Sequence, residues 1–286
     1  MKLANRFRLA SAFVAAMVAL AVAASAATVD RIRQEQTVRI AYRQDAPPFS
    51  YKDKIGEPAG LMVDLCREVA KNLAEQLNIP SLTVSYVPVS AADRFDAINQ
   101  QKADLLCEAT SATLSRREQV DFSIATFVDG AGLLVRANGP KDLRAMASQK
   151  IGVLAGTTTE EALRNTLNDA GIAADVVAAK THGEGLAMLD DGKISAYFAD
   201  RSILLSLARD SKAPGKLRLA DEYLTVEPYA LALPRGDEEF RLAVDRALSH
   251  IYRSGEISAV FERTFGAKTK PTQILQTLYV ISALPD

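Results

Sequence analysis

The chain has 286 residues, with 34 Lys or Arg and 35 Asp or Glu. The first 27 residues contain three basic and no acidic residues, so the rest has 31 basic against 35 acidic residues and a net charge of −4. This mild acidity gives no reason to expect nucleic acid as a partner. Roughly 260 residues are ample for two lobes with separate cores.

The N-terminus has the pattern of a secretory signal peptide. Lys2, Arg6 and Arg8 precede an apolar run over residues 9–24, which ends in the small residues 24–26. We expect residues 1–27 to be a leader that is cleaved near position 26 or 27. The alternative is an uncleaved membrane anchor, which the short, alanine-rich run disfavours. The chain has no cysteine near the cut, so we expect no lipid anchor.

The first elements follow one another as strand, loop and helix. Val38–Tyr42 predicts a strand, which the prolines at 47 and 48 end because proline donates no ladder hydrogen bond. A loop with Arg43, Phe49 and Tyr51 follows. A helix over Leu61–Leu77 is predicted because apolar residues recur at every fourth position. This order puts a cationic and aromatic loop at the carboxyl end of a strand, where open α/β sheets bind ligands.

Two βαβ series follow along the chain. Further strands are predicted at 82–87, 103–107, 151–153, 175–177 and 196–199, and helices at 94–101, after 156, around 186–189 and at 237–254. Alternating strands and helices predict two α/β lobes with mostly parallel sheets. The alternative is two independent domains in tandem.

The joins between the series predict a hinge. We expect the runs 130–135 and 228–233 to form two antiparallel hinge strands, and the helix 237–254 to return to the first lobe. Asp237 and Gly255 suit the two ends of this helix. The predicted domains are residues 28–131 for the first part of lobe 1, 132–226 for lobe 2 and 227–286 for the return to lobe 1. A hinged pair of lobes suits closure on a ligand.

The two cysteines, Cys66 and Cys107, have two interpretations. In an oxidising compartment a disulfide is favoured, and the alternative is a pair of small buried residues. Two separated cysteines with only His182 and His250 show no metal-ligand spacing, so neither a metal nor another cofactor is expected.

A set of short motifs carries a family resemblance over Val38 to about Phe265. The motifs are Tyr42-Arg43 before Pro48-Phe49-Ser50-Tyr51, Val87-Pro88-Val89 with Arg94, Thr110 with Arg116 before Val120-Asp121-Phe122-Ser123, Gly156-Thr157-Thr158, Ala179-Lys180-Thr181-His182-Gly183 and Asp200. In order and spacing they resemble the periplasmic polar amino-acid-binding proteins (bacterial extracellular solute-binding protein family 3), and above all their glutamate/aspartate-binding branch. The resemblance implies a periplasmic-binding-protein type II fold, with two α/β lobes joined by two hinge strands. It also implies a periplasmic monomer that delivers its ligand to an inner-membrane ABC permease.

The resemblance implies how an amino acid would be held. Arg116 matches the family arginine for the α-carboxylate, since a guanidinium donates two parallel hydrogen bonds. Thr157 and Thr158 open a helix whose free N–H groups suit the same carboxylate. Asp200 would take the ammonium group, with each charge-assisted bond contributing roughly 1.5–3 kcal/mol. Thr110 and Ser111 complete this part of the predicted site.

A second ligand carboxylate needs more positive or donor groups. Arg43, Arg94 and His182 match the positions that serve it in the glutamate/aspartate branch, which favours an acidic amino acid. Each residue also has a simpler interpretation. Arg94 would be a surface ion pair with a neighbouring aspartate, Arg116 a solvated side chain, His182 a helix-start residue, Asp200 a helix cap or ion-pair partner, and the threonines helix caps.

Three positions depart from the family pattern. Glu108-Ala109 stands where Gly-Ser is usual, Ala91 replaces a hydroxyl residue, and Met62 replaces an acidic residue. Glu108 would repel a second carboxylate unless Arg43 or Arg94 neutralises it. It could also favour an amide or another polar side chain.

The predicted function is binding without catalysis. The alternative is a periplasmic cyclohexadienyl dehydratase-like enzyme on the same scaffold, with Glu108 as its acid. A third interpretation is a sensory protein that hands its ligand-bound state to a membrane receptor. The segment after Phe265 is expected either to form a short helix or to remain mobile.

Overall fold

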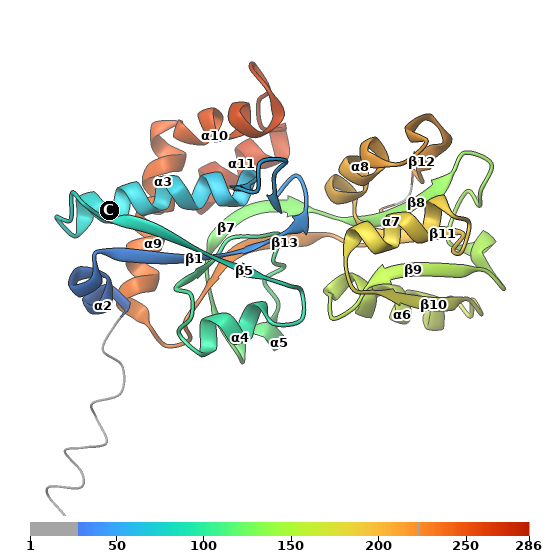
Figure 1. Ribbon diagram of the computed structural model, residues 1–286, viewed down its shortest axis with the longest axis horizontal. Helices are drawn as coiled ribbons and strands as arrows, with labels where there is room; N and C mark the ends of the chain where they lie inside the picture. Colours follow the sequence, from blue (N-terminus) through green and yellow to red (C-terminus); the bar gives the residue numbers. More distant parts are fainter. Residues whose placement is uncertain (1–27, 222, 286) are drawn as a thin grey trace, which may run out of the picture.

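The computed structural model describes residues 28–221 and 223–285. Figure 1 shows two lobes side by side, each built on its own sheet. The predicted leader, residues 1–27, lies outside the described residues. Within the described ranges, no helix combines the length and the apolar character needed to cross a membrane.

The sheet of lobe 1 has the order β5-β1-β6-β13-β7. Its strands are β1 (Thr37–Arg43), β5 (Thr83–Val89), β6 (Leu105–Leu106), β7 (Asp121–Asp129) and β13 (Glu227–Leu233). Strand β1 is parallel to β5 and β6, whereas β13 is antiparallel to β6 and β7.

The sheet of lobe 2 repeats this arrangement, with the order β10-β9-β11-β8-β12. Its strands are β8 (Ala131–Arg136), β9 (Lys150–Leu154), β10 (Asp175–Ala179), β11 (Ala196–Asp200) and β12 (Leu217–Leu219). The pairs β9–β10 and β9–β11 are parallel, and the pairs β11–β8 and β8–β12 are antiparallel. Both sheets are thus mixed, and the expectation of mostly parallel sheets was wrong. The alternation of strands and helices in the sequence predicts the parallel pairs. It does not predict the antiparallel strands that pair beside them in the same sheet.

Helices cover both faces of the first sheet. They are α2 (Thr28–Glu35), α3 (Leu61–Gln76), α4 (Arg94–Asn99), α5 (Leu114–Arg117), α9 (Glu238–Ser254), α10 (Glu256–Phe265) and α11 (Gln273–Ser282). Alternate residues of β1 enter different cores, because side chains of a strand point to opposite faces. Ile40 belongs to the core that α3 and α9 share, and Ala41 to the core beside α4.

The helix predicted over Leu61–Leu77 is observed as α3, and the apolar residues at every fourth position form its buried face, as expected. Leu61, Leu65, Val69 and Leu73 are all buried, and Leu77 caps the C-terminal end. Gly60 precedes the helix at φ 117°, where an added Cβ would lie 2.5 Å from the backbone of Phe49. Only glycine fits this position, which brings the aromatic loop against the start of α3.

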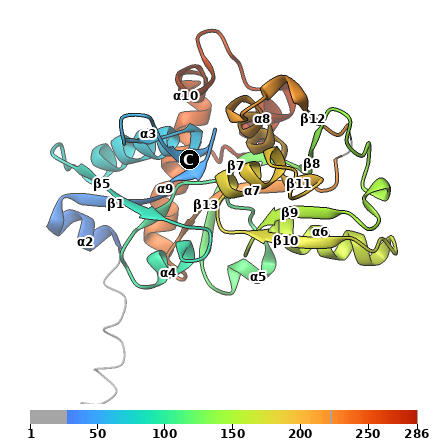
Figure 2. The same cartoon turned by 45° about the vertical axis from the view of Figure 1, so that its right-hand side comes forward.

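Lobe 2 has fewer and shorter helices. They are η1 (Arg144–Met146), α6 (Thr158–Asp169), α7 (His182–Asp190), α8 (Arg201–Asp210) and η2 (Pro214–Lys216). Helices α6 and α7 each follow a parallel strand directly, so both begin at the carboxyl edge of the sheet. Figure 2 shows α7 of lobe 2 facing lobe 1.

The segment predicted as a loop after β1 contains a small third sheet. Its strands are β2 (Asp45–Ala46), β3 (Ser50–Lys52) and β4 (Pro58–Ala59), in antiparallel order. The loop prediction was therefore wrong for Tyr51, which lies in β3. The prolines at 47 and 48 directly follow β2, whereas β1 already ends at Arg43, so the prediction that they end β1 was wrong. A two-residue strand is too short to give a detectable alternation in sequence.

The chain crosses between the lobes twice, from β7 to β8 and from β12 to β13. The runs 130–135 and 228–233 both form strands, as predicted, but these two strands do not pair with each other. Strand β8 belongs to the second sheet, and β13 pairs with β7, which was not predicted as a strand. The predicted domain boundaries at 131/132 and 226/227 stay a prediction.

The C-terminal part packs on lobe 1. The Asp237 carboxylate caps α9 by accepting a hydrogen bond from the Phe240 N–H at 3.1 Å, and Gly255 ends α9 at φ 82°. Residues beyond Phe265 form α11, whose Tyr279 hydroxyl donates to the Thr126 carbonyl of β7 at 3.2 Å. Of the two possibilities for this segment, the helix is the one observed.

Candidate functional site

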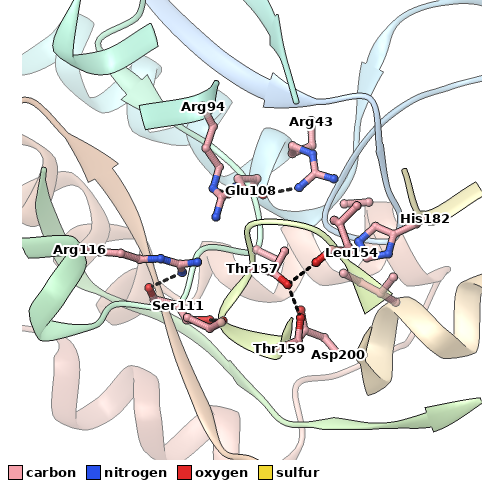
Figure 3. Close-up of a pocket in the computed structure, with 14 residues that line it drawn as sticks. Arg43, Arg94, Glu108, Ser111, Arg116, Leu154, Thr157, Thr159, His182 and Asp200 are labelled. Carbon is pink, nitrogen blue, oxygen red and sulfur yellow. Dashed lines mark hydrogen bonds and ion pairs between the residues drawn. The ribbon is translucent and has the colours of Figure 1, made fainter. Parts of the chain in front are cut away.

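A pocket lies between the lobes at the carboxyl edges of both sheets, with residues from lobe 1 and lobe 2 facing one another (Figure 3). Its lining residues are Arg43, Ala46, Arg94, Glu108, Ala109, Ser111, Arg116, Leu154, Thr157, Thr158, Thr159, His182, Asp200 and Ile203. Of the nine residues predicted to bind ligand, all but Thr110 line this pocket. Distant segments thus contribute to one site, as the resemblance implied.

Arg116 reaches the pocket from α5, a helix of only four residues. Its Nη1 donates to the Ser111 carbonyl at 2.9 Å, and its guanidinium lies 5.5 Å from the Phe95 ring centroid. These two contacts orient the planar head, which Figure 3 shows reaching toward the centre of the pocket. Burial lowers the pKa of Arg116, and the charges of Glu108, Glu227 and Asp200 oppose this effect.

Asp200 faces the pocket from the end of β11, on the opposite lobe. Burial raises the pKa of its carboxyl well above the usual value, and the neighbouring Glu227 and Asp129 raise it further. Its Oδ1 is buried and makes no hydrogen bond of normal geometry within the described residues, although the Tyr229 hydroxyl is close enough to favour the ionised form. A buried carboxylate oxygen of this kind is costly unless a cation or a donor meets it.

The start of helix α6 forms the lobe 2 wall beside Asp200. Gly156 has φ 72°, and the Thr157 hydroxyl caps the helix by accepting from the Glu160 N–H at 3.1 Å. The Thr158 hydroxyl donates to Glu227 Oε2 at 2.7 Å. The first-turn N–H groups and the positive end of the helix dipole favour an anion here.

Glu108 lies between Arg43 and Arg94 at the other end of the pocket (Figure 3). Its Oε2 is 3.5 Å from Arg43 Nη1, and its Oε1 is 3.1 Å from Arg94 Nε. All three side chains are almost completely buried. Asp45 adds a second carboxylate, whose Oδ1 accepts from Arg43 Nε at 2.9 Å and Nη2 at 2.6 Å. Arg94 is therefore not the surface ion pair that was the alternative for it.

His182 contributes a neutral ring rather than a charge. Burial, aided by the charge of Arg43, lowers its pKa to about 4, so the imidazole is uncharged at neutral pH. Its Nδ1 lies 3.1 Å from the Tyr197 hydroxyl. His182 is the first residue of α7, and it also lines the pocket. The helix-start interpretation and a position in the pocket are therefore compatible.

Thr110 does not line the pocket, and its predicted contact with the ligand stays a prediction. It is fully buried, and its hydroxyl donates to Glu108 Oε1 at 2.5 Å instead of lining the pocket. This hydrogen bond satisfies one oxygen of the buried Glu108, because a buried carboxylate needs donors. The Thr110 hydroxyl therefore stabilises the buried carboxylate of Glu108.

Two acidic residues at the site were missing from the predicted set. The sequence drew attention to Glu108 only as a departure from the family pattern. Glu227 was not noticed, although it directly precedes the predicted strand 228–233. It is buried and accepts from Thr158 and Ser111, and so joins residues of both lobes.

The lobes touch directly across the pocket. The His182 N–H donates to Asp45 Oδ2 at 3.0 Å, and the Ser111 and Thr158 hydroxyls are 3.2 Å apart. These contacts hold the lobes together over the site. The structure therefore has a closed cleft.

Two questions from the sequence remain for the residues around the pocket: whether the two cysteines form a disulfide, and whether a metal site is present. Cys66 of α3 and Cys107, directly before Glu108, are bonded with an S–S distance of 2.01 Å. Over residues 28–221 and 223–285, no three His, Cys, Asp or Glu side chains are grouped as a metal site would require.

Comparisons with known proteins identify the fold and the family. The L-glutamate/L-aspartate-binding protein of Pseudomonas aeruginosa is 29% identical over 267 residues, which cover 92% of this chain and 88% of that protein. The solved solute receptor for L-cysteine of Neisseria gonorrhoeae is 26% identical, with a TM-score of 0.74 over 86% of this chain and 98% of its own. The ancestral amino acid-binding protein AncCDT-1, a precursor of cyclohexadienyl dehydratase, is also 26% identical, with a TM-score of 0.72 over 84% of this chain and 100% of its own.

These likenesses confirm the predicted fold class, two α/β lobes of the type II periplasmic-binding-protein fold. The family model for bacterial extracellular solute-binding proteins, family 3, matches residues 38–267. The chain therefore belongs to the family 3 bacterial extracellular solute-binding proteins.

Proposed function

We propose that this protein binds a polar α-amino acid between its lobes in the periplasm and presents it to an inner-membrane ABC permease. The observation that carries the proposal is the opposition of Arg116 from lobe 1 and Asp200 from lobe 2 across one pocket. An α-amino acid carries a carboxylate and an ammonium group on one carbon. A cation and an anion facing each other across a cleft match this pair of charges.

The α-carboxylate would bind Arg116 and the start of α6. Arg116 offers a planar fork of donors, and the first turn of α6 offers free N–H groups. Because the two donors come from different lobes, a carboxylate that contacts both favours the closed state. A ligand shifts such an equilibrium only by as much as it binds the two states differently.

The ammonium group would bind Asp200. The raised pKa of this carboxyl shows that its charge is poorly stabilised without a cation. A ligand ammonium group supplies that cation, and Glu227 adds further negative charge nearby. Asp200 thus gains on binding the interaction that it lacks in the described structure.

The ligand side chain would point to Arg43, Arg94 and His182. Two observations support the acidic amino acids predicted from the sequence: these arginines line the pocket, and the Pseudomonas aeruginosa relative is named for glutamate and aspartate. The pairing of Glu108 with both arginines argues against a second carboxylate. We therefore propose a polar amino acid as the class, and glutamate and aspartate are two candidates within it.

The dehydratase alternative has weaker support in the geometry. It needs an acid that gives its proton to a departing group. The two oxygens of Glu108 are engaged by Arg43, Arg94 and Thr110, so this carboxyl is poorly placed to serve as that acid. An assay with prephenate or arogenate separates the two functions.

Calorimetry tests the proposal. The protein would be unfolded and refolded to remove bound ligand, then titrated with each standard amino acid. We expect one-to-one binding of at least one polar amino acid and loss of this binding in Arg116→Ala. If none of the amino acids binds and prephenate or arogenate is turned over, the binding function is wrong.

A further inference from the structure

At the end of the pocket that would face the ligand side chain, the two arginines already lie against two carboxylates of the protein, one of which lines the pocket. Arg43 contacts Asp45 and Glu108, and Arg94 contacts Glu108. Glu108 has 2% of its surface exposed, and Arg43 and Arg94 have 3% each. Charges buried this deeply are stable only when they are paired. At this end of the pocket the charges therefore balance without any contribution from a ligand.

Glu108 is held in this position from several sides. The Thr110 hydroxyl donates to its Oε1, and the preceding Cys107 is bonded to Cys66 of α3. The Cys107 N–H also donates to the Ala41 carbonyl of β1 at 2.9 Å. The backbone before Glu108 is thus fixed to the sheet and to a helix. A ligand carboxylate would have to displace a carboxylate that is anchored in place.

Each class of ligand side chain meets this end of the pocket differently. A second carboxylate would bring three negative charges to two arginines in a water-poor site, where like charges repel strongly. A cationic side chain would lie against the guanidinium groups of Arg43 and Arg94. An uncharged polar side chain adds no charge and can still accept hydrogen bonds from Arg94, whose Nη2 makes only a long contact of 3.5 Å with the Gly156 carbonyl.

We propose that Glu108 is a built-in substitute for the ligand's acidic group, so that the pocket selects α-amino acids with uncharged polar side chains and rejects dicarboxylic ones. This inference rests on the proposed amino-acid function. It explains why Thr110 faces Glu108 and not the pocket.

The experiment compares glutamine with glutamate, and asparagine with aspartate, by calorimetry on the refolded full-length chain. These pairs differ only in the charge of the side chain. For the unchanged protein we expect at least tenfold tighter binding of one amide than of its acid. Tighter binding of glutamate or aspartate than of the amides would overturn the inference and leave the amino-acid function standing. Failure of every amino acid to bind would overturn both.

A variant tests whether Glu108 causes the preference. Glu108→Gln keeps the shape of the side chain and removes its charge, so the amide preference should fall at least tenfold and the acid should bind more tightly. Glu75→Gln removes one negative charge from an exposed position of α3 and should leave the preference unchanged. An unchanged preference in a folded Glu108→Gln variant would contradict the proposal. If the Glu108→Gln variant does not fold, the comparison of amides with acids in the unchanged protein still tests the proposal.

Discussion

The two ends of the pocket are built from similar residues but differ in how their charges are satisfied. At the first end, Arg116 is held by a backbone carbonyl, and Asp200 has a buried oxygen without a normal hydrogen bond in the described residues. At the second end, Arg43 is paired with Asp45 and Glu108, and Arg94 Nε lies 3.1 Å from Glu108 Oε1, close enough for an ion pair although not in hydrogen-bond geometry. The charged groups at the first end therefore gain strong interactions from a charged ligand, whereas those at the second end gain only weak ones. An arginine in a pocket thus indicates an anionic ligand only when the protein does not itself supply the anion.

The largest effect is expected at the first end, from Arg116→Ala. Losing one partner of a buried charge pair costs about 2–5 kcal/mol, so affinity should fall at least about 30-fold. Arg116→Lys should recover part of this loss, because an ammonium is a point charge that cannot form two parallel bonds. Arg117→Ala, at the exposed neighbouring position, is the matched control. Calorimetry measures all three, and equal affinities for Arg116→Ala and Arg117→Ala would exclude Arg116 from the site.

The same end should release a proton when ligand binds. In the closed structure without ligand, burial together with Glu227, Asp129 and Glu108 raises the pKa of Asp200. A ligand ammonium group lowers that pKa again, so binding drives a proton off the carboxyl. Affinity should therefore fall as the pH falls through the free-state pKa of Asp200.

Calorimetry in buffers with different heats of ionisation measures this proton release. The apparent binding enthalpy of the unchanged protein should vary with the buffer, and Asp200→Asn should remove the variation. The lost charge-assisted bond should also reduce affinity by about 1.5–3 kcal/mol, or roughly tenfold or more. A buffer-independent enthalpy in the unchanged protein would mean that Asp200 is already ionised.

A smaller effect is expected from the contact that joins the lobes beside the second end. Asp45→Ala removes the hydrogen bond from the His182 N–H at 3.0 Å, which joins the lobes, and also two hydrogen bonds from Arg43, which lie within lobe 1 and do not join the lobes. A single hydrogen bond contributes about 1 kcal/mol, so the ligand should dissociate roughly fivefold faster. Asp96→Ala, at an exposed position of α4, is the control. The ligand dissociation rates of the two variants would be measured by stopped flow. Equal rates would contradict the role of Asp45 in holding the lobes closed.

Sequence reasoning succeeded where the signal was local. The four-residue spacing of Leu61, Leu65, Val69 and Leu73 predicted α3 almost to the residue, and Asp237 and Gly255 marked the ends of α9. Eight of the nine residues predicted from the motifs line the pocket, and most of these lie at the end of a strand or at the start of a helix. These features depend on neighbours in the chain.

Sequence reasoning failed where the answer depends on distant partners. Strand β7 was not predicted, and the partners of β8 and β13 could not be named, since pairing between strands leaves no mark in the sequence of either strand. Thr110 was placed in the pocket because its dependence on Glu108 requires the folded geometry. Glu227 was missed because only the folded chain brings it beside Thr158 and Ser111.

A crystal structure with the amino acid that binds most tightly tests the contrast between the two ends most directly. We predict that the α-carboxylate contacts Arg116 and the start of α6, and that the ammonium group contacts Asp200. The side chain should lie toward Arg94 while Glu108 keeps its ion pairs with Arg43 and Arg94. A ligand carboxylate bound to Arg43 and Arg94, with Glu108 displaced, would contradict the account.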